Sequence, residues 1–180
     1  MDSFELPSGV AVRPWRRDDA PELLRTVEAE RGRLARWMPW VPYATSVADF
    51  TDFIDRSMAQ EREGTGIQRG LFDEAAVVGA VGASIGSLNF DEADVGYWIT
   101  GAREGRGDAS VTTRHLIDWL FSERDMYRIT IRAALENEKS RAVAERLGFS
   151  YEGVLRGSLL LDGEHKDAAL YALLHPEWTS

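Results

Sequence analysis

The 180-residue sequence contains no cysteine. This absence excludes disulfide bonds, a thiolate nucleophile and zinc sites with cysteine ligands. Histidine is also scarce, because the chain has three, His115, His165 and His175, at spacings that are not typical of metal ligands. We therefore expect a protein that works without a metal ion and without a covalent intermediate on cysteine.

Long apolar runs are absent too. No uninterrupted apolar stretch approaches the roughly 20 residues that a membrane-spanning helix needs. The opening residues, MDSFELPSGV, lack the basic and then apolar pattern of a signal peptide. We expect a cytoplasmic protein that does not bind membranes. The net charge of −9 disfavours nucleic-acid binding, which needs a basic surface, and suits a cationic partner such as an amine or a basic peptide.

Periodic segments predict one mixed α+β domain over residues 1–180. Strands are expected at 10–15, 67–74, 75–90, 93–100, 127–133, 149–161 and 165–174, and helices after Asp19, Ser46, Ser110 and Asn137. Asp162-Gly163 is a strong hairpin signal between the last two strands. The order β-α-α-β-β-β-α-β-α-β-β indicates a mostly antiparallel sheet flanked by helices.

A glycine-rich segment, GAREGRGDAS at 101–110, joins an expected strand to an expected helix. The first amides of a helix have no partners inside it and favour an anion. Gly105 and Gly107 would let the backbone approach a phosphate closely, and Arg103 and Arg106 could add positive charge. From the residues alone, a tight turn and a phosphate cradle remain alternatives.

The segment from Glu104 to Ala109 is similar to the signature Gln/Arg-x-x-Gly-x-Gly/Ala at Gly107 and Ala109, and departs from it at Glu104. Further similar segments are Arg13-Pro14, Trp37-Met-Pro-Trp40, Gly96-Tyr97-Trp98, Glu136-Asn137, Leu147-Gly-Phe149, Glu152-Gly-Val-Leu155 and Tyr171-Ala-Leu-Leu174. Together these motifs resemble the GCN5-related N-acetyltransferase (GNAT) superfamily, in its branch that acetylates ribosomal-protein N-termini (RimJ/RimL-like). The resemblance covers nearly the whole chain.

This resemblance implies acetyl-CoA, or another acyl-CoA, as the donor. It implies that the pantetheine arm pairs with the backbone around Trp98, Ile99 and Thr100. The pyrophosphate would lie on the amides of the loop, formed by Glu104, Gly105, Arg106, Gly107, Asp108, Ala109 and Ser110. In the branch, the residue matching Asn137 contacts CoA and the one matching Ser140 assists the departing thiolate. From the residues alone, Asn137 is a helix N-cap and Ser140 a small packing residue.

On the acceptor side, the resemblance points to Trp37, Trp40, Tyr97 and His165. Trp37 and Trp40 either wall a pocket or cover the core, and His165 is equally typical of a surface hairpin. Tyr97 and Trp98 alternate along one strand, so one is expected to face the acceptor and the other the core. Where the best-known members have a glutamate base, residues 157–161 read GSLLL. Asp91, Glu92 and Asp94 are interpreted as turn residues rather than as a base.

The sequence thus predicts an N-acetyltransferase for a primary amine, most of all an α-amino group of a protein or peptide. One alternative is a small-molecule amine acetyltransferase that acts on an antibiotic or a polyamine. The other is a CoA-sensing domain without turnover, which Glu104 and the missing glutamate favour. Members of the branch often form dimers, which implies a homodimer here.

Overall fold

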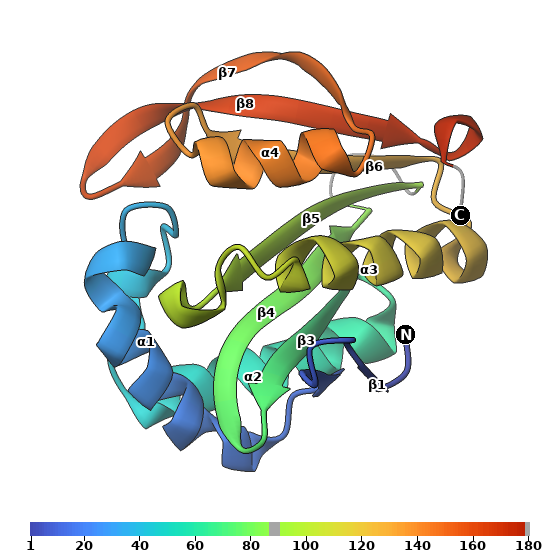
Figure 1. The fold of residues 1–180 in the computed structure, drawn as a ribbon. Coiled ribbons are helices and arrows are strands. Elements are labelled where there is room, and N and C mark those ends of the chain that lie inside the picture. Colours follow the sequence, from blue (N-terminus) through green and yellow to red (C-terminus); the bar gives the residue numbers. More distant parts are fainter. Residues whose placement is uncertain (87–90, 179–180) are drawn as a thin grey trace.

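The computed structural model describes residues 1–86 and 91–178, and over these it contains four α-helices and one eight-stranded sheet (Figure 1). The strands are β1 (Phe4–Glu5), β2 (Ala11–Pro14), β3 (Gly66–Asp73), β4 (Ala76–Ile85), β5 (Glu92–Ile99), β6 (Arg128–Ala134), β7 (Ser150–Leu161) and β8 (Glu164–Leu174). The helices are α1 (Ala20–Leu34), α2 (Val47–Glu63), α3 (Asp108–Arg124) and α4 (Glu138–Arg146).

The predicted order of elements is confirmed, with one addition. The two-residue strand β1 pairs antiparallel with β2, with Phe4 opposite Val12. A strand of two residues is too short to produce a periodic pattern, so no sequence pattern indicated it. The last four residues of the strand expected at 75–90 lie outside the described residues, and β4 ends at Ile85.

The interpretation of Glu92 and Asp94 as turn residues is wrong. β5 begins at Glu92, which is buried, and Asp94 lies inside the strand. Acidic residues are unfavourable in strands, but here each meets an arginine of the neighbouring strand β6. Glu92 lies 3.5 Å from Arg128, and Asp94 lies 2.7 Å from Arg132.

The sheet has the strand order β1-β2-β3-β4-β5-β6-β8-β7. Neighbouring strands are antiparallel except β5 and β6, which are parallel. Parallel neighbours need a crossover connection, and α3 supplies it. The β5–β6 pairing runs only from Glu92–Arg128 to Val95–Ile131, so the last four residues of β5 continue beyond it.

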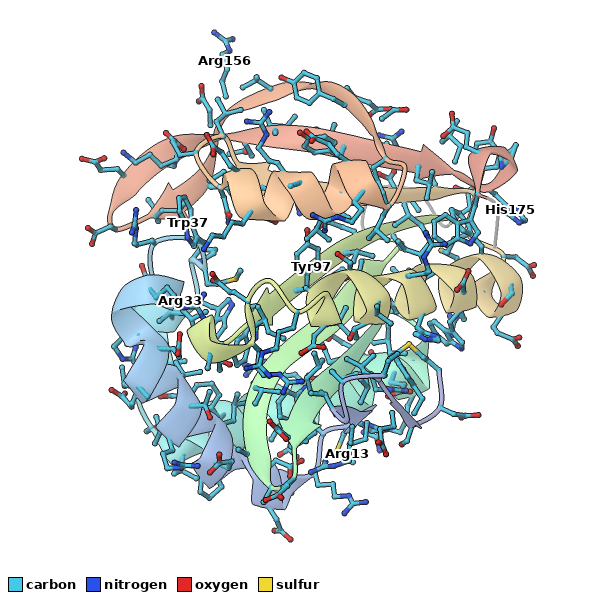
Figure 2. All side chains as sticks on the ribbon, in the orientation of Figure 1. Arg13, Arg33, Trp37, Tyr97, Arg156 and His175 are labelled. Carbon is cyan, nitrogen blue, oxygen red and sulfur yellow. The ribbon has the colours of Figure 1, made fainter. Side chains whose placement is uncertain are left out.

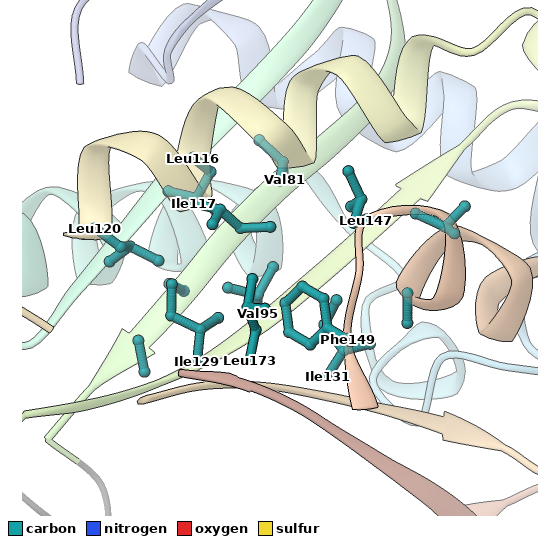
Figure 3. Packing of buried hydrophobic residues seen from close by; sticks show 14 of the residues in the cluster. Val81, Val95, Leu116, Ile117, Leu120, Ile129, Ile131, Leu147, Phe149 and Leu173 are labelled. Carbon is teal, nitrogen blue, oxygen red and sulfur yellow. The ribbon is translucent and has the colours of Figure 1, made fainter. Parts of the chain in front are cut away.

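Helices cover both faces of the sheet. α1 and α2 pack over Trp15, Phe72, Val77 and Ala80 on one face. On the other face, α3 buries Leu116, Ile117 and Leu120 in a cluster with Val81, Val95, Ile129 and Ile131, and α4 adds Val143, Ala144 and Leu147 (Figure 3). This packing fixes α3, and with it the glycine-rich loop at the end of β5.

The two predicted helix starts in the N-terminal half differ in outcome. The start at Ser46 is confirmed: its Oγ accepts a hydrogen bond from the Asp49 amide, and the Asp49 carboxylate accepts one from the Ser46 amide. Asp19 precedes α1 as predicted but does not cap it. Its carboxylate instead binds the Arg13 guanidinium and the Arg16 amide. None of the described helices has the length and apolarity to cross a membrane.

Candidate active site

A strand edge is left open where the β5–β6 pairing ends. The Thr100 amide donates to the Val78 carbonyl at 2.8 Å, so the backbone groups of Trp98 and Thr100 face β4. Because these groups alternate along a strand, those of Tyr97 and Ile99 face the opening. Of the three residues predicted to pair with pantetheine, Ile99 therefore presents its backbone to the opening.

The glycine-rich loop follows directly. A short 3₁₀ turn at Gly101–Arg103 leads to Gly105 and Gly107, whose φ angles are +74° and +85°. A Cβ atom at either glycine would meet nothing within 4 Å, so the backbone conformation rather than crowding favours glycine there. The outer side of the loop is open. Gly107 caps α3, a 17-residue helix whose first amides face this open side.

Arg103 does not add charge to this open side, contrary to the sequence-based expectation. Its guanidinium is buried and its Nε lies 2.9 Å from the buried carboxylate of Asp108. Ser8 also donates to Asp108, at 2.6 Å, and Asp73 lies 3.2 Å from Arg103 Nη1. Asp108 thus points its side chain into the protein, and what it offers to a ligand is its backbone.

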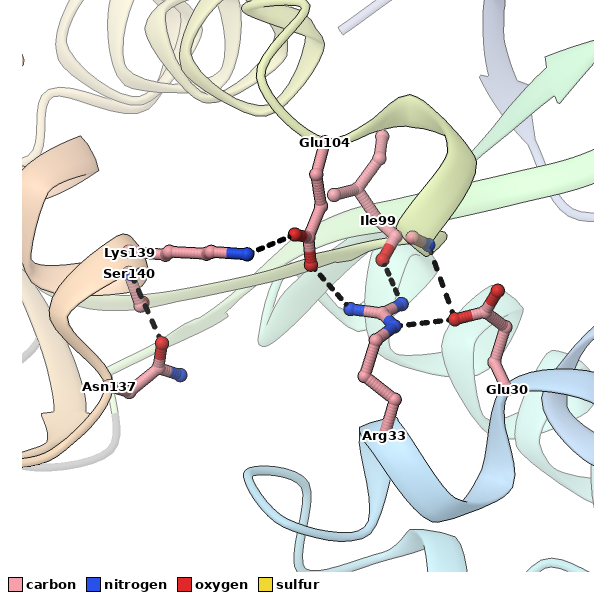
Figure 4. Close-up of polar contacts among 8 residues, drawn as sticks. Glu30, Arg33, Ile99, Glu104, Asn137, Lys139 and Ser140 are labelled. Atoms are coloured by element: carbon pink, nitrogen blue, oxygen red, sulfur yellow. Dashed lines mark hydrogen bonds and ion pairs between the residues drawn. The ribbon is translucent and has the colours of Figure 1, made fainter.

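Glu104 is held by two cations that the sequence did not single out (Figure 4). Its carboxylate accepts from Lys139 Nζ on α4 at 2.5 Å and from Arg33 Nη1 on α1 at 2.8 Å. The hydrogen bond from Lys139, aided by the charge of Arg33, lowers the pKa of Glu104. Glu104 therefore stays ionised at neutral pH with its charge compensated by Lys139 and Arg33.

Arg33 also reaches the open strand edge. Its Nη2 donates to the Ile99 carbonyl at 2.5 Å, and its Nε donates to Glu30, which accepts from the Gly101 amide at 3.2 Å (Figure 4). The end of α1 is thereby tied to the end of β5 and to the start of the loop. Sequence patterns missed Arg33 because a charged residue on a helix usually marks a solvated face.

Asn137, Ser140 and Tyr97 meet on the side of the sheet that carries α4. Asn137 is the predicted N-cap: its Oδ1 accepts from the Ser140 amide at 3.2 Å (Figure 4). The Ser140 hydroxyl donates to the Tyr97 hydroxyl at 3.2 Å, and Tyr97 donates to the Ser140 carbonyl at 2.9 Å. Burial raises the pKa of Tyr97 to about 12, so the phenol remains protonated at neutral pH. Figure 2 shows Tyr97 between α3 and α4.

The opposite face of β5 borders a cavity of about 590 Å³. Trp98 and Trp40 line it, with ring centroids 6.5 Å apart, and Phe50 lies 6.3 Å from Trp40. The α2 residues Phe50 and Phe53 contribute both to the core and to the cavity wall. The sheet residue Gln68, which no motif marked, also lines the cavity.

The structure places two of the four residues predicted on the acceptor side at the cavity and the other two away from it. Trp40 lines the cavity and Tyr97 borders it, although the Tyr97 hydroxyl lies on the α4 side of β5, whereas Trp37 and His165 are not among the lining residues. Trp37 lies beside the end of α1, on the side of the β7–β8 hairpin (Figure 2). The His165 Nδ1 lies 3.0 Å from the Gly157 carbonyl, within a bulge of β7 that Asp167 also holds.

Most carboxylates near the cavity are hydrogen-bonded or ion-paired to other groups of the protein. Asp49 holds the N-terminus of α2, and Asp94 is paired with Arg132 and Thr130. Asp52 lines the cavity and is exposed, with Arg56 as the lining guanidinium. Within residues 1–86 and 91–178, no three His, Asp or Glu side chains gather as metal ligands.

The chain shares its family model and its fold with known proteins. A model described as an acetyltransferase (GNAT) domain matches residues 10–150. The “Putative ribosomal N-acetyltransferase YdaF” of Bacillus subtilis (strain 168) is 33% identical over 99% of this chain and 98% of its own length. The ribosomal protein uS5-alanine N-acetyltransferase of Escherichia coli (strain K12) is 30% identical over 66% of this chain and 62% of its own. Mycobacterium smegmatis RimJ, solved with CoA-disulfide, superposes with a TM-score of 0.89 at 27% identity, over 99% of this chain and 88% of that one.

The raised pKa of Tyr97 makes stability depend on alkaline pH. An unfolded tyrosine ionises near pH 10, whereas Tyr97 in the folded protein ionises near pH 12, so the unfolded state loses its proton first. The stabilisation is complete below pH 10 and is lost as pH rises to 12. We expect the difference in unfolding free energy between wild type and Tyr97→Phe to fall by about 1.4 kcal/mol from pH 9 to pH 11 in urea titrations. A difference that stays constant would contradict a buried, protonated phenol.

Proposed function

The chain belongs to the acetyltransferase (GNAT) family, and from this premise we propose that residues 1–180 act as one domain that acetylates an α-amino group of a protein or peptide, with acetyl-CoA as the donor. The observation that carries the proposal is the opening beside Ile99, with the glycine-rich loop at one end and the Ser140–Tyr97 pair on its α4 side. Ribosomal proteins are the first acceptor class to test, because two relatives are named for them. We place the reaction in the cytoplasm; pairing of two copies stays a prediction.

The open strand edge and loop fit the donor. The backbone of Ile99 can pair with the amides of the pantetheine arm, as an added strand would. The amides from Gly105 to Ser110 lie at or just before the N-terminus of α3, where phosphates are favoured, and two glycines leave that surface uncovered, whereas the Glu104 amide donates to the Gly101 carbonyl. Arg33 donates a hydrogen bond to the Ile99 carbonyl. When the pantetheine arm binds at this carbonyl, the Arg33 side chain must move away or turn toward the donor.

The Ser140–Tyr97 pair fits the leaving group. In the proposed reaction the neutral amine attacks the thioester carbonyl, and the bond from that carbon to sulfur breaks. Ser140 turns its hydroxyl hydrogen from the Tyr97 oxygen to the departing sulfur, while Tyr97, which stays protonated, holds Ser140 through the hydrogen bond to its carbonyl. The amine loses its extra proton to water. Asn137 positions Ser140 by capping α4 and is proposed to contact the donor as well.

The cavity on the other face of β5 is the proposed acceptor site. Trp98 and Trp40 form its aromatic wall beside the opening. A cavity of about 590 Å³ also suits a small-molecule amine, since ligand sites commonly measure about 300–1,000 Å³. A small-molecule amine is therefore the second candidate acceptor. The argument for a non-catalytic sensor loses one support, because the charge of Glu104 is compensated by Arg33 and Lys139.

Removing the carboxylate of Glu104 tests the donor site. We expect Glu104→Gln to tighten CoA binding by about 0.3–1 kcal/mol, because a negative charge leaves the phosphate loop and two cations are released toward the donor. Calorimetric titration with CoA measures this change. Glu28→Gln is the control, because it removes an equal charge that pairs with Arg31 on α1. Weaker binding to Glu104→Gln would instead show that Glu104 is needed to order the loop.

Removing the Ser140 hydroxyl tests the leaving-group role. We expect Ser140→Ala to lower kcat by about tenfold or more while CoA affinity changes less than about twofold, because the hydrogen bond to sulfur strengthens mainly in the transition state. Ser122→Ala, which removes an exposed hydroxyl near the C-terminal end of α3, is the control. Unchanged kcat under conditions where chemistry limits the rate would return Ser140 to a packing role.

The missing glutamate base predicts a preference for α-amines. An α-amino group has a pKa of about 7.7–8.0 and lysine about 10.4, so at pH 7 about a tenth of α-amines but fewer than about one lysine in a thousand are neutral. We expect one lysine-containing peptide to react about 100-fold faster with its α-amine free than with its ε-amine free, at pH 7. The rate with the α-amine should rise toward pH 8. Faster ε-acetylation would reveal a base that the described residues do not provide.

A further inference from the structure

The floor of the cavity is formed by one glutamine and two glycines of the sheet. Gln68, Gly82 and Gly96 stand opposite one another on β3, β4 and β5. The Gln68 side chain lies over Gly82, because a Cβ built there would be 2.1 Å from Gln68 Oε1. A Cβ built on Gly96 would meet nothing within 4 Å. The floor is therefore filled over Gly82 and open over Gly96.

This open floor adjoins the proposed reaction centre. Gly96 is followed by Tyr97, whose hydroxyl bonds Ser140, and by Trp98, whose ring lines the cavity. The β5–β6 pairing ends one residue before Gly96, so the gap in the sheet begins there. A group resting on Gly96 would lie beside the opening proposed for the donor.

The walls of the cavity are aromatic, and two of the three carboxylates that line it are already bound by other groups of the protein. Trp15, Trp40, Phe50, Phe53 and Trp98 line it. Of its three lining carboxylates, Asp49 is engaged at the start of α2 and Asp94 with Arg132, and the other charged residues of the lining are Asp52 and Arg56. Apolar contact, rather than ion pairing, therefore decides which acceptor body the cavity retains.

The cavity has room for a large acceptor group. Its volume is about 590 Å³, and Trp98, Trp40 and Phe50 are among the residues that line it. A large apolar or aromatic side chain next to the amine can contact this aromatic wall, whereas the side chain of an N-terminal alanine or serine offers it only one methyl or hydroxymethyl group.

We infer that the acceptor carries a bulky apolar or aromatic group next to its α-amine, and that this group is held over Gly96 between the aromatic walls. The inference rests on the proposed function and narrows it to N-terminal residues such as phenylalanine or leucine rather than alanine or serine. One missing methylene in an apolar enzyme pocket already costs about 10-fold or more in kcat/KM.

Four peptides that differ only in residue 1, with Ala, Ser, Leu or Phe, test the inference at saturating acetyl-CoA. We expect kcat/KM for Phe and Leu to exceed that for Ala and Ser about tenfold or more. Gly96→Ala and Gly96→Val fill the open floor, so each should reduce this preference, with Val reducing it more. Gly32→Ala adds the same methyl on the exposed side of α1, where it also meets nothing within 4 Å, and should keep the preference.

The outcomes separate the inference from the function on which it rests. Equal or faster reaction of the Ala and Ser peptides overturns the inference and leaves α-amine acetylation standing. A preference that both Gly96 variants retain also overturns it, because the bulky group would then bind elsewhere. If the enzyme binds CoA but acetylates none of the four peptides, the proposed peptide acceptor fails and the inference fails with it. Gly96→Ala, which adds one methyl to open space, keeps the test valid if Gly96→Val does not fold.

Discussion

The β5–β6 pairing ends before β5 does, and this early end positions both sides of the proposed site. Backbone groups in a sheet are strongly favoured to pair, and the two strands part after Val95 and Ile131 although β5 continues to Ile99. The unpaired edge creates a place for an extended ligand. It also gives the sheet two accessible sides at one point, with Ser140 and Tyr97 on one and Trp98 and Trp40 on the other. A donor and an acceptor can meet there without sharing a pocket.

The polar network around this opening links elements that are distant in sequence. Arg33 of α1 spans the Ile99 carbonyl and Glu104, and Lys139 of α4 completes the bridge. These pairs are partly exposed, so each contributes little to stability. Their effect is on position: they set the end of α1 and the start of α4 on either side of the loop. A donor phosphate would compete with Glu104 for the same two cations.

Local patterns in the sequence predicted the elements well, because helix caps, turn glycines and periodic apolar residues act over a few positions. Ser46, Asn137 and Asp162-Gly163 all do what their neighbours indicate. Tertiary partners were harder to predict. Glu92 and Asp94 are tolerated in a strand by Arg128 and Arg132, and Glu104 by Arg33, at separations of more than 30 residues. The direction of each side chain could not be predicted from the sequence either. Whether Tyr97 or Trp98 faces the acceptor therefore stayed open, and no sequence pattern marked Gly96 as a position with free space above it.

Hydrogen–deuterium exchange with and without CoA can locate the donor, because it reports on the backbone amides of the opening themselves. We expect saturating CoA to slow exchange over residues 96–110, including the Ile99 amide on the open edge and the amides of the glycine-rich loop, while β2 and β3 on the far side of the sheet are unchanged. Binding of CoA, detected by calorimetry, without slower exchange in residues 96–110 would contradict this expectation, because the donor would then occupy some other surface of the protein.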